Sequence, residues 1–526
     1  MGAAGSDAQA ERGADAGAAG RGGIFVLGAK VFFIVIGFVQ QALLKAVLGL
    51  AEYGALARVL SPANIVNNVV VQGSIQGVSR RVAPARERFR GELAAAMRVH
   101  APIAVVLGAS FALFAGPFSE FQRSPHIATP LRVMAIVALA YGFYAPLVGT
   151  INGRSLFGRQ AMLDVLFATL RTAGLVGLGW LFVKRGASGT LGATVGFAAA
   201  AALITPLAAV WALRGGRASA LRSDGASSIA ASAYLGQLLT VALAQFLVNS
   251  LMQADLSLVG RFLSDGALSA GLEPAAARFE ADEWVGVYRA CQLFAFLPYQ
   301  LVLSVAQVLF PMVARAHADG DRAAVALTVG RGMRIAPIMA GLIVAIVIAL
   351  PGTLLHFAYG ATVAARGALA LRVLAVGQGA FALFGVASTV LVSLGQERRS
   401  VALSGAALVL VGAACFAFAQ HAAFGAPQLV GTATATSLGL FAALALAAVV
   451  VRRVAGAFVP LGTALRVFVA VAIVASAGAR LPDVGRALAP FAALGVATIY
   501  LLLLLVLREL GAADLTAVKS ILRRRR

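Results

Sequence analysis

The sequence MRIAPIMAGLIVAIVIALP at residues 333–351 follows a basic connection and opens a long apolar segment. A similar beginning, MRVHAPI at residues 97–103, also follows a basic connection and opens an apolar segment. The strings LRVMA at 131–135 and LRVLA at 371–375 form a second such pair. The members of the two pairs are 236 and 240 residues apart, so their order and spacing are kept. Two matches in register predict that the halves of the chain repeat one transmembrane design.

The composition predicts a membrane protein. The chain has 526 residues, of which 60% are hydrophobic and only 12% charged, whereas about 25% of a soluble domain is charged. Apolar runs of roughly 20 residues recur along the chain, and this is the length of a helix that crosses a bilayer. A β-barrel would instead show alternating segments of about ten residues. We therefore expect an all-α polytopic membrane protein with about 14 transmembrane helices.

The net charge of +22 has a topological explanation. The basic residues lie in short connections, and alternate connections carry 28 and 10 of them. By the positive-inside rule, this bias places both termini in the cytoplasm. The one acidic connection, 263–283, then lies outside. Nucleic-acid binding is not expected, because the charge is spread over the loops instead of forming one patch.

The repeat predicts how the chain is divided. Six spans in each lobe give the lobes the same orientation, related by a pseudo-twofold axis along the membrane normal. The tail ends in four arginines and is either an amphipathic helix on anionic lipid or a solvated segment. The predicted parts are a disordered cytoplasmic leader at 1–22, an N-lobe at 23–225, a C-lobe at 226–455, two further helices at 456–508 and a basic cytoplasmic tail at 509–526.

Four short motifs carry a family resemblance. They are LGLAEYG at 48–54, GSIQGVSR at 73–80, VLFP at 308–311 and LGQER at 394–398. In this order, over residues 24–450, the sequence resembles the multidrug/oligosaccharidyl-lipid/polysaccharide flippase superfamily. The resemblance implies a transporter in the bacterial inner membrane that works by alternating access.

Two segments of the sequence indicate which branch of that superfamily the chain resembles. The lipid II flippases commonly carry an Arg-Asp pair after Gly-Phe in the first helix and paired arginines in the second. This chain has GFVQQ at 37–41 and Asn67-Asn68 instead. The resemblance therefore favours a flippase for an undecaprenyl-diphosphate-linked repeat unit of O-antigen, capsule or exopolysaccharide, with a polysaccharide polymerase as a partner. A lipid II flippase is the second reading and a drug/cation antiporter the third.

Polar side chains within the spans are the candidate substrate-binding residues, because such groups normally face a cavity or pair with each other. Lys30, Arg171 and Arg289 could bind the diphosphate. The alternatives are snorkelling for Lys30 and a structural pair with Asp164 for Arg171. Neutral amides suit sugar hydroxyls, although they also serve as interhelical hydrogen-bonding groups. The candidate amides are Gln40, Gln41, Asn67, Asn68 and Gln72.

Asp255 is the candidate ion-coupling residue, since it is an acid deep in the predicted second lobe. It could bind H⁺ or Na⁺, or form a salt bridge with Arg289. The two cysteines and five histidines have no metal-ligand spacing, so no metal or cofactor is expected. A membrane enzyme on lipid-linked sugars, such as a polymerase or ligase, would need a positioned acid/base group in a large outward loop. The longest outward connection is only the acidic 263–283, so we expect a transporter and no enzyme.

Overall fold

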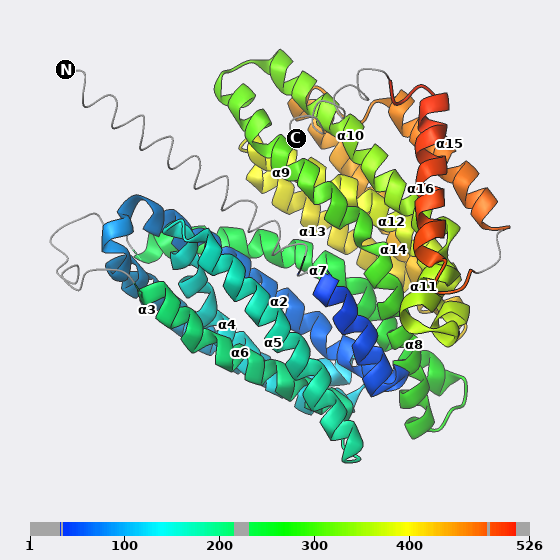
Figure 1. The fold of residues 1–526 in the computed structure, drawn as a ribbon, viewed down its shortest axis with the longest axis horizontal. Coiled ribbons are helices and arrows are strands. Elements are labelled where there is room, and N and C mark those ends of the chain that lie inside the picture. Colours follow the sequence, from blue (N-terminus) through cyan, green and yellow to red (C-terminus); the bar gives the residue numbers. More distant parts are fainter. Residues whose placement is uncertain (1–31, 33–34, 215–230, 481–483, 512–526) are drawn as a thin grey trace. The chain divides into compact units, whose positions relative to one another are not determined.

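A computed structural model describes residues 32, 35–214, 231–480 and 484–511. Lys30, the predicted leader and the tail beyond residue 511 lie outside the described residues. Two compact units divide the chain, unit 1 at Met1–Gln253 and unit 2 at Ala254–Arg526. Figure 1 shows the helices of unit 1 in blue to green and those of unit 2 in green to red.

The described residues form helices throughout. A helix at Val35–Leu48 comes first. It is followed by α2 (Leu50–Val82), α3 (Phe89–Phe121), α4 (Ala128–Gly153), α5 (Phe157–Lys184), α6 (Gly189–Leu213) and α7 (Ala231–Ser269). The chain continues with α8 (Pro274–Ala295), α9 (Leu297–Ala318), α10 (Arg322–Ala349), α11 (Pro351–Tyr359), α12 (Ala361–Ser393), α13 (Glu397–Ala414), the π-helical turn Cys415–Ala419, α14 (Ala426–Ala455), α15 (Leu461–Gly478) and α16 (Ala489–Val506).

The structure confirms the predicted all-α polytopic fold. Among the described residues, twelve helices are long and apolar enough to cross a membrane. The two other predicted spans correspond to the shorter helix Val35–Leu48 and to α2. α2 is 33 residues long, but it carries a run of amides that lowers its hydrophobicity.

Several helices extend beyond the apolar segments that predicted them. The connection 263–283 is mostly helical, because α7 ends at Ser269 and α8 begins at Pro274. The long apolar stretch at 284–312 forms parts of two helices, α8 and α9, which meet at Phe296, next to Pro298. Pro351 likewise begins α11 directly after α10. Proline lacks the N–H that would continue the preceding helix, so it sits at the first turn of the next one.

The turns of the two halves match at the spacing of the sequence repeat. Ser155 has φ 57° and Gly395 has φ 69°, and these residues are 240 positions apart. The same closing bond occurs at both turns, from the N–H of Leu156 to the Ile151 carbonyl (3.1 Å) and from the N–H of Gln396 to the Leu391 carbonyl (2.8 Å). The two turns therefore share one backbone conformation at a separation of 240 residues.

Small residues set the closest helix packing within each unit. In unit 1, a Cβ at Gly196 of α6 would lie 1.9 Å from the Gly174 carbonyl oxygen of α5. In unit 2, a Cβ at Gly377 of α12 would lie 2.3 Å from the Ser437 hydroxyl of α14. Such contacts are the usual way in which membrane helices gain packing energy, since the lipid provides no hydrophobic driving force between them.

Candidate functional site

Two buried amides link the first helix of unit 1 to its neighbours. The Oε1 atom of Gln40 accepts a hydrogen bond from Thr172 Oγ1 of α5 at 3.0 Å. The Oε1 atom of Gln41 accepts one from the Tyr53 hydroxyl of α2 at 2.9 Å. The bond to Thr172 places Gln40 beside the turn of α5 that carries Arg171. The amides thus hold three helices together around this polar region.

The amides of α2 have different surroundings. Asn67 is buried, and its Nδ2 atom has no hydrogen-bond partner among the described residues. Asn68 donates from Nδ2 to Asn249 Oδ1 of α7 at 2.8 Å, and Gln72 is exposed. Asn67 therefore has a buried donor without a hydrogen-bond partner among the described residues.

Arg171 lies against an aromatic cluster. Its guanidinium carbon is 4.9 Å from the centre of the Phe197 ring of α6. Tyr141 of α4 contacts Phe197 edge-on at 6.2 Å and Phe167 of α5 at 5.6 Å, between ring centres. Tyr144 contacts Phe167 at 5.7 Å. A guanidinium group held over an aromatic ring in this way loses part of its hydration and keeps one orientation.

Asp255 of α7 is the centre of a polar network in unit 2. The Tyr288 hydroxyl donates to Asp255 Oδ2 at 2.9 Å, and Gln292 Nε2 donates to Oδ1 at 2.9 Å. The backbone N–H of Leu256 also donates to Oδ1, at 2.8 Å. Three donors thus surround a carboxylate that is almost completely buried, which is how proteins compensate a buried charge.

Arg289 is joined to this carboxylate through an intermediate side chain. Its Nη1 atom donates to Gln292 Oε1 at 3.1 Å, and Gln292 in turn donates to Asp255. Among the described residues, no direct ion pair connects Asp255 to Arg289. Gln292 therefore links the positive charge of Arg289 to the buried carboxylate of Asp255.

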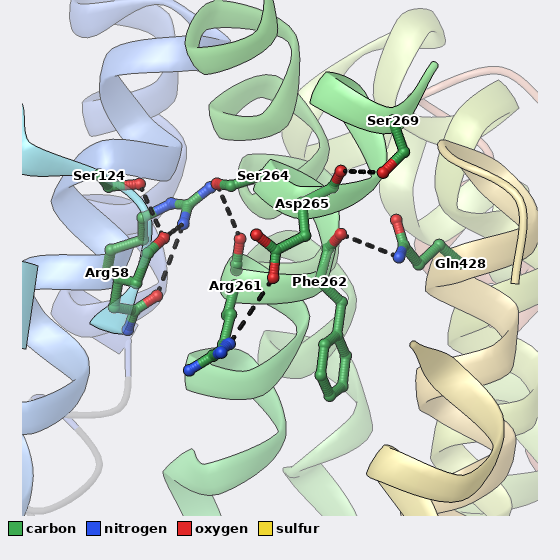
Figure 2. Close-up of polar contacts among 10 residues, drawn as sticks. Arg58, Ser124, Arg261, Phe262, Ser264, Asp265, Ser269 and Gln428 are labelled. Carbon is green, nitrogen blue, oxygen red and sulfur yellow. Dashed lines mark hydrogen bonds and ion pairs between the residues drawn. The ribbon is translucent and has the colours of Figure 1, made fainter. Parts of the chain in front are cut away.

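Sequence reasoning missed two buried polar residues of unit 1. Arg58 lies in the third turn of α2 and has no exposed surface. Its Nη1 atom donates to the Gln122 carbonyl at 3.2 Å, next to Ser124 (Figure 2). His100 of α3 contacts the Ser74 hydroxyl at 3.3 Å and the Tyr234 hydroxyl at 3.0 Å.

The sequence contains only weak indications that Arg58 and His100 are buried. Arg58 lies near the beginning of an apolar segment, where an arginine usually reaches the headgroups. His100 stands alone in its segment. Only the three-dimensional positions of Gln122 and Tyr234, which are distant in sequence, show that these groups are buried and paired.

Comparisons with known proteins were made for sequence and for structure. The family model described as "Polysaccharide biosynthesis protein" matches residues 19–317, which is more than half of the chain. A search of curated proteins found no match.

Three solved structures illustrate the structural likeness. "Lipid II flippase MurJ, inward closed conformation" has a TM-score of 0.69 at 12% identity, covering 91% of this chain and 98% of that one. The inward-facing conformation of a multidrug resistance MATE family transporter of the MOP superfamily has a TM-score of 0.61 at 14% identity, covering 82% and 98%. A MOP superfamily transporter from Pyrococcus furiosus, whose title states that reverse polarity of the binding pocket suggests a different function, has a TM-score of 0.52 at 16% identity, covering 82% and 94%. At these identities the likeness shows the fold.

Proposed function

Because the chain belongs to the family of polysaccharide biosynthesis proteins, we propose that it is a flippase for a diphosphate-linked oligosaccharide precursor. The family match over residues 19–317 is the observation that carries this proposal. The substrate is an undecaprenyl-diphosphate-linked repeat unit of O-antigen, capsule or exopolysaccharide. It moves from the cytoplasmic to the outer leaflet of the bacterial inner membrane, where a polysaccharide polymerase uses it. Both termini of the flippase lie in the cytoplasm.

Each unit contributes one part of the proposed mechanism. In unit 1, Arg171 over the Phe197 ring provides a fixed positive charge for a phosphate group, and the free donor of Asn67 suits a sugar hydroxyl. Gln40, Gln41, Asn68 and Gln72 belong to the same proposed substrate region, as does Lys30 of the first helix. In unit 2, Arg289 provides the second cation.

Asp255 couples transport to an ion gradient in this proposal. The atoms next to its carboxylate are N–H and O–H donors of Leu256, Gln292 and Tyr288. A sodium ion needs several oxygen ligands, as hard cations do. Of the three described groups that donate to the carboxylate, only the Tyr288 hydroxyl places an oxygen next to it. The arrangement favours a proton, which would displace one donor and loosen the link through Gln292 to Arg289. Alternating access then follows from a change in this network.

Transport in vesicles tests the proposal. The purified chain should move a fluorescent lipid-linked repeat unit across the bilayer without changing the glycan, and an inward-directed or outward-directed pH gradient should change the rate. Asp255→Asn should reduce transport to background while the protein remains in the membrane, because the amide cannot carry the proton. Asp265→Asn, on the same helix but partly exposed beside Arg261, is the matched control and should transport normally. Full transport by Asp255→Asn would refute the coupling role.

A lipid II flippase is the second candidate. The overall likeness to the lipid II flippase structure at a TM-score of 0.69 favours it. The amides at 40–41 and 67–68 stand where that branch commonly has charged residues, and this favours the repeat unit. Vesicles that contain lipid II and the repeat unit in parallel decide between the two: transport of lipid II alone would overturn the proposed substrate.

A further inference from the structure

Three arginines converge on the carboxyl end of α6 in unit 1. Arg154 Nη1 donates to the Ala212 carbonyl at 2.8 Å, and Arg159 Nη1 donates to the Trp211 carbonyl at 3.1 Å. Arg90 Nη2 donates to the Leu213 carbonyl at 3.2 Å. The C-cap of α6, Arg214, has an extended backbone. The three guanidinium groups therefore satisfy carbonyls of the last turn, which have no partner within the helix.

The cluster carries more positive charge than this role requires. The end of a helix amounts to roughly half a negative charge, whereas Arg90, Arg154 and Arg159 bring three positive ones. Neither Arg90 nor Arg159 forms an ion pair among the described residues. Burial and the charges of Arg159 and Arg90 lower the pKa of Arg154, as expected for positive groups that are close enough to cause repulsion. An anion at this place would relieve that repulsion.

Two of the guanidinium groups also have donors to spare. An arginine has five N–H donors, and the bonds of Arg90 and Arg159 to α6 use only one nitrogen of each. The Nε atom of Arg90 is buried and has no hydrogen-bond partner among the described residues. Arg154 is fixed over the Phe89 ring, with 3.9 Å between its guanidinium carbon and the ring centre. A phosphate oxygen is the acceptor that suits such a preorganised group.

On two helices, α6 and α5, exposed apolar side chains lie close to the arginines in the sequence or at the same helix end. On α6, Leu203, Val210 and Leu213 are 63%, 46% and 43% exposed. The spacing of seven and three residues places them along one side of the helix. On α5, Met162 is 61% exposed, one turn after Arg159. In a membrane-spanning unit such surfaces face acyl chains, and basic residues at their ends lie at the level of the headgroups.

We propose that Arg90, Arg154 and Arg159 form a binding site for the phosphate of an anionic phospholipid, whose acyl chains lie along α5 and α6. Charge complementarity and the two flanking apolar surfaces select a two-chain lipid with a net negative headgroup. The site shares no residue with the proposed substrate region, and its three arginines lie at the ends of α3, α4 and α5. A bound phospholipid would secure the end of α6, from which the chain leads on to α7.

The lipid content of the purified full-length protein tests this site. After exchange into micelles that contain equal amounts of phosphatidylglycerol and phosphatidylcholine, the wild type should retain phosphatidylglycerol preferentially, as measured by native mass spectrometry. The double variant Arg90→Gln/Arg159→Gln should lose this retention several-fold. The control Arg80→Gln/Arg98→Gln, which removes the same charge from α2 and α3, should keep it. Equal retention by the two double variants would overturn the proposal.

Two further measurements remain informative if the double variant is unstable. With the wild type, raising the salt concentration from about 0.1 M to about 1 M should release phosphatidylglycerol, because the Debye length falls from about 10 to about 3 Å. Retention that salt does not change would contradict an electrostatic site. In a competition arm, phosphatidylglycerol should resist displacement by an equal concentration of a polyprenyl diphosphate. Displacement at that concentration would assign the cluster to the transport substrate and overturn the phospholipid site.

Discussion

At the scale of single residues, buried polar groups in this protein are compensated by partners that are distant in sequence. Asp255 accepts hydrogen bonds from Tyr288 and Gln292 on α8. Gln428 of α14 donates to the Phe262 carbonyl of α7 at 2.9 Å, and Figure 2 shows its side chain directed toward that carbonyl. Arg58 donates to Gln122 at the end of α3. An uncompensated polar group inside a bilayer would cost several kcal/mol, so each of these pairs fixes the position of two helices.

Arg58→Met should destabilise the protein by about 1–3 kcal/mol, because the carbonyl and side-chain oxygens of Gln122 lose a charged donor in a buried place. The measurement is the unfolding midpoint in detergent. Arg80→Met is the matched control, since Arg80 is an exposed arginine of the same helix. It should change the free energy of unfolding by no more than about 0.5 kcal/mol. An equal effect of the two substitutions would mean that the burial of Arg58 is not what matters.

At the scale of helices, the motif LGLAEYG at 48–54 has a structural explanation. Gly49 adopts φ 81°, which lets the chain turn between the first helix and α2. Glu52 Oε2 then accepts hydrogen bonds from the Thr190 N–H at 2.8 Å, from the Ser188 hydroxyl at 3.2 Å and from the Thr190 hydroxyl. A carboxylate at the amino end of α6 is favourable for both the free N–H groups and the helix dipole. The motif therefore joins the start of α2 to the start of α6.

Glu52→Gln should loosen the first turn of α6 by about 1 kcal/mol, because the charge is lost while the shape is kept. Hydrogen exchange at the backbone amides of residues 190–192 should become faster, and the rest of α6 should be unchanged. Glu120→Gln, an exposed acid in the last turn of α3, is the control and should leave these amides as they are. Unchanged exchange in Glu52→Gln would show that Glu52 does not cap α6.

At the scale of the whole molecule, the chain consists of two compact units, and the last two helices belong to unit 2. α15 and α16 pack on α10 through an apolar cluster that includes Val467, Val474 and Tyr500. At the end of α16, Glu509 accepts hydrogen bonds from Arg334 of α10 at 2.9 Å and from Arg466 of α15 at 3.0 Å. The side chain of Glu509 is almost fully buried. One carboxylate thus ties three helices together.

The attachment of α15 and α16 should weaken in acid. Burial would raise the pKa of Glu509, but the hydrogen bonds from Arg334, Thr463 and Arg466 outweigh it, so the pKa lies below the ordinary 4.5. A lowered pKa in the folded state means that the stabilisation is complete above about pH 4.5 and is lost as the pH falls through the lowered value. Limited proteolysis of the connection 456–460 should therefore accelerate below that pH. Glu509→Gln should give this faster cleavage already at pH 7, and a variant that shows the same pH dependence as the wild type would contradict the role of Glu509.

The boundary between the two units was harder to predict from the sequence than the helices were. The predicted boundary at 225/226 stays a prediction, whereas the compact units meet within α7, at Gln253 and Ala254. The early part of α7 finds its partners in unit 1, as Asn249 does with Asn68. Asp255 has its partners Tyr288 and Gln292 in unit 2. A hydrophobicity pattern contains no information about which bundle a given turn of an apolar helix will contact.

The sequence by itself determined the class of fold, the positions of the helices and the repeat of about 240 residues. These follow from local physics, because only runs of roughly 20 apolar residues can cross a bilayer as helices and because duplicated turns keep their spacing. The tertiary structure alone decided that Arg58 and Glu509 are buried, that Gln292 stands between Asp255 and Arg289, and that three arginines meet at the end of α6. Each of these depends on partners up to 175 residues away, and the cost of a buried polar group is set by those partners and not by its neighbours in the chain.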